Sequence, residues 1–225
     1  MIGDKYLMET TTNINGLDLN YEQVNYFQKS KADIVFNGEI EFIGEELKMV
    51  ISESILKINQ FKLSVEGDFL MSPKDYLMNL SISTLDQDFK SLFSIVPGVY
   101  KQDFSSINTN GAFDFQCLIN GVYSDSLVPK IDMDLAVNNG FFKYPDLPNS
   151  VENIDVKLDI DFPGGHNLDL LKINLNDFSL SFLNSSFSSN IYASNLISDP
   201  FLKSVLISKI DLLDISKVYP IKGQE

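Results

Sequence analysis

NIDVKLDIDF, at residues 153–162, is the stretch from which the fold class of this chain follows most directly. Apolar side chains stand at every second position, and mostly charged side chains stand between them. Successive side chains of a β-strand point to opposite faces of a sheet, so this segment predicts a strand with one apolar and one charged face. The same alternation occurs in residues 32–42, 61–69, 76–82, 113–123, 131–137 and 173–182. We therefore expect an antiparallel, mostly β protein with one face of its sheet in solvent.

Glycine-rich turn signals separate these segments and predict short strands. They are NG at 37–38, EGD at 66–68, NG at 110–111 and 120–121, NNG at 138–140, and FPGG at 162–165. Such dipeptides favour hairpin turns, because glycine and asparagine adopt the required backbone angles easily. The pattern predicts about ten strands of roughly six to nine residues each.

Two further segments have helical spacing. DQDFKSLFSIVP (86–97) and DLLDISKVYP (211–220) each carry an apolar stripe and each end at a proline, which predicts two short amphipathic helices. FKLS at 61–64 and FSLS at 178–181 are each expected to begin a strand, and each is followed by further strands and one of these helices. This recurrence predicts pseudo-repeats over about 31–100 and 150–220, within a single elongated region spanning 1–225. Residues 1–30 are not assigned to a repeat.

The composition excludes several classes of function. With 17 basic and 31 acidic residues, the chain has a net charge of −14 and no basic cluster, so we expect no nucleic-acid partner. No apolar run is long enough to span a membrane, and the first residues lack the features of a signal peptide. We expect the chain itself to be soluble, with any export signal or anchor upstream in a longer parent protein.

The sequence offers no catalytic constellation. His166, the only histidine, lies in a glycine-rich turn, and Cys117, the only cysteine, is in phase with apolar neighbours. The pairs Asp132/Asp134 and Asp159/Asp161 are compatible with calcium or glycosidase chemistry, but they alternate with apolar residues as a solvated strand face does. We predict no catalytic residues, no metal site, no cofactor and no enzymatic activity.

The apolar faces of the strands must be shielded from water. A second sheet, the two helices or an apolar ligand would each supply one, and periodicity alone favours a closed sandwich. The frequent Phe and Met, 17 and 6 in number, suit either a closed core or a groove for acyl chains.

A family resemblance bears on this choice. The chain resembles the C-terminal region of the AsmA family, as found in Bacteroidetes-type bacteria, over about residues 31–220. The segments that carry the resemblance are INQFKLSVEGDFLMSPKDYLMNLSIST (58–84), FKSLFSIVPGVYKQDFSSINTNGAFDFQCLINGVYSD (89–125), VNNGFFKYPDLPNSVENIDVKLDIDFPGG (137–165) and NLISDPFLKSVLISKIDLLDISKVYP (195–220).

The resemblance implies a piece of a periplasmic envelope protein whose parent is anchored in the inner membrane. The family is related to bridge-like lipid-transfer proteins such as TamB, in which a curved sheet offers an apolar groove to acyl chains. It therefore implies a non-enzymatic role in moving phospholipid and supporting outer-membrane biogenesis, with a phospholipid or another acyl-chain lipid as partner and other envelope proteins as further partners. The expected fold is a mostly β, elongated, curved antiparallel sheet of repeated strand units with two short amphipathic helices, forming an apolar groove or open sandwich.

The lipid-groove candidates follow from strand phase within this resemblance. They are Ile34, Phe36, Ile40, Phe42, Phe113, Phe115, Ile131, Met133, Leu135, Ile154, Val156, Leu158 and Ile160.

Two other functions remain open from the sequence. The first is a closed β-sandwich that serves as a structural or protein-interaction module of the cell envelope. The second is a carbohydrate-binding β-sandwich, which the absence of tryptophan makes less favourable because exposed aromatic rings grip sugars.

Overall fold

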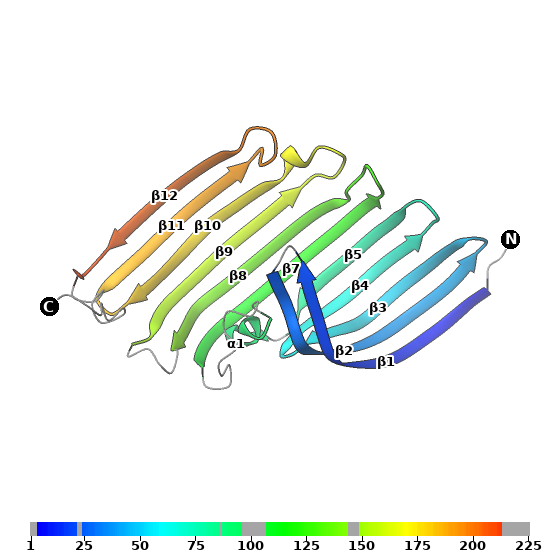
Figure 1. The fold of residues 1–225 in the computed structure, drawn as a ribbon, viewed down its shortest axis with the longest axis horizontal. Coiled ribbons are helices and arrows are strands. Elements are labelled where there is room, and N and C mark those ends of the chain that lie inside the picture. The colour runs from blue at the N-terminus through cyan, green and yellow to red at the C-terminus, as the bar shows by residue number, and fades with distance from the viewer. Residues whose placement is uncertain (1–3, 22–23, 86, 96–106, 144–148, 213–225) are drawn as a thin grey trace.

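A computed structural model of the chain describes residues 4–21, 24–85, 87–95, 107–143 and 149–212. Their strands form one open antiparallel sheet of 12 strands (Figure 1). The first half comprises β1 (Asp4–Tyr21), β2 (Val24–Ile43), β3 (Glu46–Ile58), β4 (Phe61–Met71), β5 (Tyr76–Thr84) and β6 (Gln87–Asp88). The second half comprises β7 (Asn108–Tyr123), β8 (Lys130–Lys143), β9 (Val151–Phe162), β10 (Lys172–Phe182), β11 (Ser185–Ser194) and β12 (Phe201–Lys209). The predicted mostly β, elongated antiparallel sheet is confirmed.

The strands follow one another along the sheet in chain order. The path runs β1-β2-β3-β4-β5-β7-β8-β9-β10-β11-β12, and β6 pairs with β7 beside it. Three of the hairpins turn through only two residues, beginning at Gly44, Asn59 and Leu183, whose φ angles of 65°, 55° and 53° lie in the left-handed region. Such turns match the twist of the flanking strands. Among the described strands, β1 and β12 are the two edges of this meander.

Most of the predicted turns are wrong. The signals at 37–38, 66–68, 110–111, 120–121 and 138–140 lie inside strands, and only FPGG at 162–165 follows the end of one. In the strand interiors glycine permits a close approach of neighbouring backbone: a Cβ on Gly67 would lie 1.9 Å from the Asn79 carbonyl oxygen, and one on Gly38 would lie 2.2 Å from that of Val50. The strands are consequently longer than predicted, and β2 reaches 20 residues.

β-Bulges keep the apolar side chains of a long strand on one face. In β3 the register shifts between Ile51 and Ser54, where Glu53 has a φ of 42°. Before the shift the odd-numbered Met49 pairs with Ile40; after it the even-numbered Leu56 pairs with Ile34. One extra residue reverses the side-chain alternation, so the bulge restores the phase of the apolar residues. The hydroxyl of buried Ser54 fills the bulge, accepting from the Asn37 N–H at 3.0 Å.

One of the two predicted helices is described. Helix α1 (Phe89–Phe93) occupies five residues of the predicted 86–97, of which residues 86, 96 and 97 lie outside the described part. The Asp88 carboxylate caps α1, because it accepts a hydrogen bond from the Ser91 N–H at 3.0 Å. Most of the second predicted helix, from residue 213 onward, also lies outside the described residues. A 3-10 turn, η2 (Leu168–Leu170), precedes β10.

The core lies where α1 packs on the sheet. Buried Phe61, Phe89, Phe113, Val137 and Ile154 form one cluster, contributed by β4, α1, β7, β8 and β9. This cluster sits near one end of the strands (Figure 1). The division into pseudo-repeats stays a prediction; FKLS begins β4 as expected, whereas FSLS lies inside β10.

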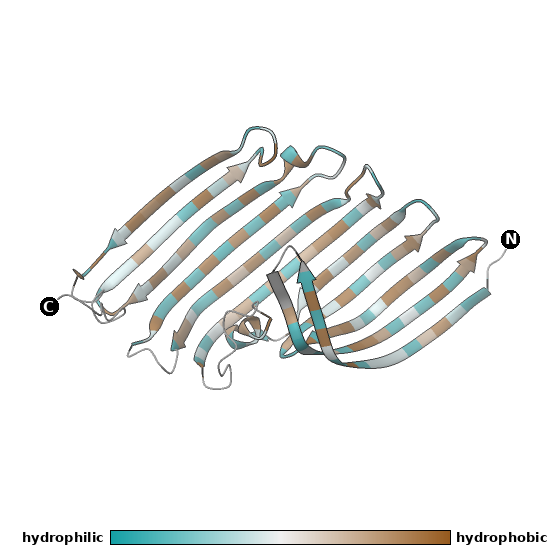
Figure 2. Cartoon of the chain, viewed as in Figure 1, coloured by the Kyte–Doolittle hydropathy of each residue, from teal (hydrophilic) through white to brown (hydrophobic). Residues whose placement is uncertain are grey.

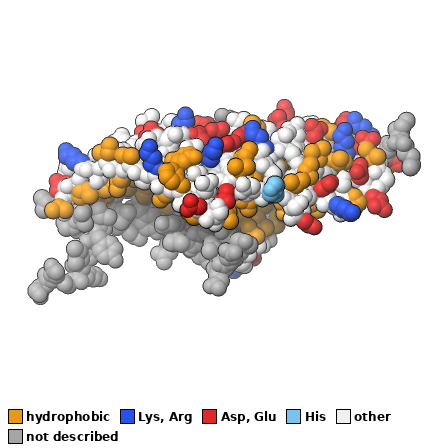
Figure 3. Space-filling model, turned by 90° about the horizontal axis from the view of Figure 1, so that it is seen from above, with side chains coloured by type: hydrophobic (Ala, Val, Ile, Leu, Met, Phe, Trp, Pro, Cys, Tyr) orange, Lys and Arg blue, Asp and Glu red, His pale blue; other side chains and the backbone are white. Residues whose placement is uncertain are grey.

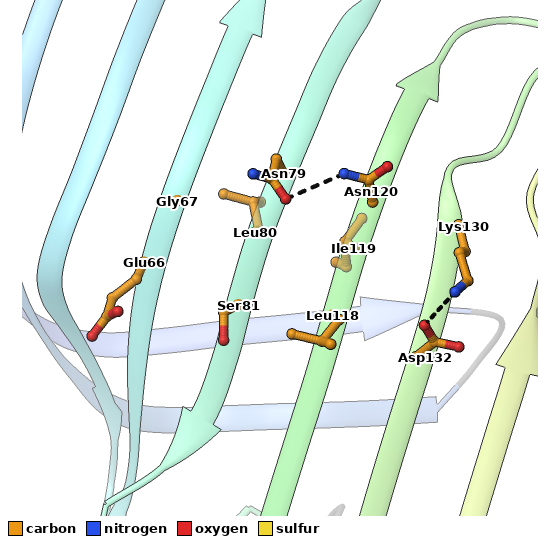
Figure 4. A pocket seen from close by; sticks show the side chains of 10 residues that line it. All are labelled: Glu66, Gly67, Asn79, Leu80, Ser81, Leu118, Ile119, Asn120, Lys130 and Asp132. Carbon is orange, nitrogen blue, oxygen red and sulfur yellow. Dashed lines mark hydrogen bonds and ion pairs between the residues drawn. The ribbon is translucent and has the colours of Figure 1, made fainter.

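Within the unassigned residues 1–30, residues 4–21 and 24–30 belong to the paired strands β1 and β2. Register shifts around Gly16 and Leu17 accompany a bend, and the far half of the β1–β2 hairpin crosses the sheet on the side of α1 (Figure 1). A view from the opposite side shows the hairpin passing behind the central strands (Figure 4). Within the described residues there is no second sheet, so the closed sandwich favoured by periodicity alone is wrong.

Candidate functional site

Strand register brings all thirteen predicted groove residues to one face of the sheet. Residues directly opposite each other in a ladder point to the same side. Leu135 pairs with both Phe115 and Leu158, and Met133 pairs with Ile160. The remaining candidates lie on the same face. Each one either pairs with an apolar residue on a neighbouring strand or stands two residues from one that does. We call this side, which α1 and the β1–β2 hairpin also occupy, the apolar face.

The apolar face is larger than the predicted set. Cross-strand rows also run through β4, β5, β10, β11 and β12, whose residues were not in the predicted groove set although 61–69, 76–82 and 173–182 were recognised as alternating. One row joins Val65, Ile82, Cys117, Met133, Ile160, Ile173, Ala193 and Leu202 across eight strands. Figure 2 shows the resulting bands of alternating hydropathy along the strands. The pairing that joins these segments into one face is set by the arrangement of the whole sheet, so the phase within a single segment does not reveal it.

Helix α1 covers only one end of the apolar face. Among the predicted groove residues, Phe113 and Ile154 are 2% and 6% exposed and belong to the core cluster. Phe115, Leu135 and Val156 are half-buried and pack against that cluster. The structure therefore places these five residues in or beside the protein's own core rather than on an open surface.

The other eight candidates lie away from the core cluster. Phe42 is 55% exposed, and the others are half-buried: Ile34, Phe36, Ile40, Ile131, Met133, Leu158 and Ile160. Partial exposure of so many large apolar side chains on one face is unusual for a folded domain. This part of the face is the candidate site.

Aromatic side chains line the rim of the face at the strand ends farthest from α1. Tyr76 stacks on Phe69 with ring centroids 5.8 Å apart, and Tyr123 lies 6.2 Å from Tyr76. On the outer strands Tyr6 meets Phe42 edge to face at 6.4 Å. Tyrosine has an apolar ring and a polar hydroxyl, so it suits a boundary between apolar surface and water.

The opposite face is charged. Figure 3 shows acidic and basic side chains gathered along the upper side of the curved sheet and hydrophobic side chains beneath. Asp132 pairs with Asp161 and Asp134 with Asp159 across β8 and β9. A hydrogen bond from Lys130, whose ammonium lies 2.8 Å away, lowers the pKa of Asp132, whereas the shared hydrogen bond with Asp159 raises the pKa of Asp134.

This charged face carries no site for a metal among the described residues. A shallow hollow of about 490 Å³ lies over β4, β5, β7 and β8 (Figure 4). Its polar lining includes Glu66, Ser81, Asn120 and Asp132, and an amide–amide hydrogen bond of 3.2 Å joins Asn120 to Asn79. The predicted solvated role of the aspartates agrees with this setting, since both Asp132 and Asp134 are at the surface.

Neither of the two reactive residue types forms a nucleophilic site. Burial raises the pKa of the Cys117 thiol, which disfavours the reactive thiolate. His166 is exposed in the loop after β9. Both residues lie where the sequence pattern predicted them.

Among the described residues, no helix has the length and apolarity that crossing a membrane requires. No family model, curated protein or solved structure matches the chain, so its resemblance to the AsmA family stays a prediction.

Proposed function

We propose that this chain carries lipid acyl chains on the apolar face, as a non-enzymatic section of an envelope protein. In this proposal the parent protein is anchored in the inner membrane, the sheet stands in the periplasm, and phospholipid movement supports the outer membrane. The observation that carries the proposal is the run of half-buried apolar side chains beyond the reach of α1. The predicted family resemblance supports the cellular setting.

The apolar face is wider than helix α1 can cover. Strands spaced about 4.8 Å apart make the eleven-strand path about 48 Å wide. A five-residue helix is only about 7.5 Å long, so α1 shields a small part of the face. The bent β1–β2 hairpin passes over a further part. Acyl chains would shield the remainder, and each methylene buried contributes about 0.8 kcal/mol.

The geometry suggests how a lipid would lie. Its tails rest on the rows of Ile, Leu and Met side chains, and its headgroup stays in water beyond the tyrosine rim. A face covered on one side only holds each tail weakly, which permits movement along the rows. Gradients or partner proteins would drive that movement, because no bond is made or broken.

Lipid binding is directly measurable. The purified chain, incubated with phosphatidylethanolamine and phosphatidylglycerol vesicles and reisolated, should retain phospholipid detectable by native mass spectrometry. It should also speed the transfer of a fluorescent phospholipid between donor and acceptor vesicles. Absence of both bound lipid and transfer would overturn the proposal.

The fold predicted for each of the two alternative functions differs from the described sheet. The interaction module was predicted as a closed β-sandwich and the carbohydrate-binding module as a β-sandwich, whereas the described strands form one open sheet.

A further inference from the structure

Strand β12 lies at one edge of the described sheet. It pairs with β11 on one side and with no strand among the described residues on the other. All nine of its residues are exposed. A long exposed edge presents a row of backbone N–H and C=O groups that readily accept another strand.

Both faces of β12 carry exposed aliphatic side chains. Leu202 and Leu206, 68% and 66% exposed, continue the apolar face. On the charged face β12 presents Val205 and Ile207, 52% and 67% exposed, where β9 presents carboxylates. Side chains directly opposite each other on neighbouring strands pack together on the same face. A further strand beside β12 would therefore cover part of this exposed apolar area.

The two lysines of β12 have no carboxylate opposite them on β11. Lys203 and Lys209 are its only charged residues, and they lie opposite Tyr192 and Ser186 of β11. Neither lysine forms an ion pair within the part of the chain that is described. Several lysines on the interior strands stand opposite carboxylates in the ladders, as Lys172 does opposite Asp161 and Lys48 opposite Glu41. A neighbouring strand with acidic residues would complete the pattern.

The other edge does not share these features. Strand β1 carries charged residues on both faces, and its Lys5 already forms an ion pair with Glu39 of β2. Its far half bends over the sheet through bulges. Bulges and bends are devices by which edges avoid further pairing, whereas β12 pairs with β11 without a register shift.

We propose that β12 accepts an antiparallel strand from an acidic partner segment, which extends the sheet. This segment carries two carboxylates six residues apart on its charged face and aliphatic side chains on the other. The spacing matches Lys203 and Lys209, and the antiparallel direction continues that of every other pair. A second copy of β12 does not fit, because it would bring two basic strands together without a carboxylate. This interaction uses the edge of the sheet and not the lipid-carrying face.

The chain itself contains a suitable probe sequence. A synthetic peptide NIDVKLDIDF has the carboxylates of Asp155 and Asp161 six residues apart. Laid antiparallel to β12, it sets Asp161 opposite Lys203 and Asp155 opposite Lys209, and it sets Leu158 opposite Leu206. The same sequence in the folded protein places Asp161 directly opposite Lys172 of β10.

A charge exchange tests the proposal. A fluorescently labelled peptide should bind the wild-type protein, measured by anisotropy. The K203E/K209E variant should bind it about tenfold more weakly, because two exposed ion pairs become repulsive. A peptide carrying D155K/D161K should show the opposite preference and bind K203E/K209E best. The control variant K48E/K57E, with the same change of charge on β3, should bind the original peptide as the wild type does.

Three results would overturn the proposal. They are equal binding of the two peptides by both proteins, loss of binding in K48E/K57E as well, and a wild-type dimer in sedimentation that K203E/K209E separates. Phospholipid retention by K203E/K209E should equal that of the wild type. A failure at the edge is thus distinguishable from a failure of lipid binding.

Discussion

Replacing Leu158 by aspartate separates an open apolar face from a packed core. Leu158 is half-buried, and it stands in the row between Leu135 and Leu175. Full burial of a leucine side chain contributes about 1.5–3 kcal/mol to stability, so its partial burial contributes about 1 kcal/mol. Because the site is partly open, the new carboxylate keeps much of its hydration. We expect Leu158→Asp to lower the free energy of unfolding by about 1–2 kcal/mol and to leave the chain folded.

Lipid retention should respond far more strongly than stability. An acyl chain lying across residue 158 would remove the carboxylate from water, at a cost of about 2 kcal/mol or more. That cost corresponds to about a thirtyfold loss of affinity. Phospholipid extracted from the reisolated variant, measured by mass spectrometry per mole of protein, should fall accordingly.

Two control variants make the result interpretable. Val137→Asp places a carboxylate at a residue 2% exposed in the core cluster, so it should cost more than about 4 kcal/mol and unfold the chain. Lys157→Asp places the same side chain on the opposite face of β9, and it should change lipid retention little. Urea unfolding followed by circular dichroism gives the stability of each variant. If Leu158→Asp unfolds as Val137→Asp does, Leu158 is core; if it folds and retains lipid, the tails lie elsewhere. Either result refutes the proposed site.

Three further predictions concern the fold and its charges. Gly67→Ala should destabilise the sheet by about 3 kcal/mol or more, because its φ is 132° and the new Cβ would meet the Asn79 carbonyl; an unchanged melting temperature would contradict this. Asp88→Ala removes the cap of α1 and should cost about 1 kcal/mol in urea unfolding, with a cost near zero arguing against the cap. Because the hydrogen bond with Asp159 raises the pKa of Asp134 above its ordinary value, the folded state takes up the proton before the unfolded state does. The contribution of Asp134 to stability therefore rises as the pH falls through its folded pKa, and Asp134→Asn should remove that rise between pH 7 and 4; identical pH profiles would contradict it.

The alternation of β9 was readable from sequence because its phase is unbroken from Ile154 to Phe162. The turn predictions failed for a physical reason: Gly38 and Gly67 serve close approaches between long strands, and a dipeptide signal does not distinguish this from a hairpin. The phase change at Glu53 depends on pairing with neighbouring strands, so local periodicity hides it. The core around Phe113 was placed on the correct face, but its cover by α1 depends on tertiary packing.

The bulge in β3 bears most directly on what the apolar face does. Leu56 and Ile58, at the end of β3 where α1 packs on the sheet, pair with Leu63 and Phe61, which belong to the core or contact it. Leu47, Met49 and Ile51 lie beyond the bulge, outside that cluster, and without the phase change they would face the charged side. If the core beneath α1 were the only purpose of the apolar face, placing these three residues on that face would add little to the stability of the fold. Their alignment extends the apolar rows to the tyrosine rim, and a continuous surface of that length is what an acyl chain requires.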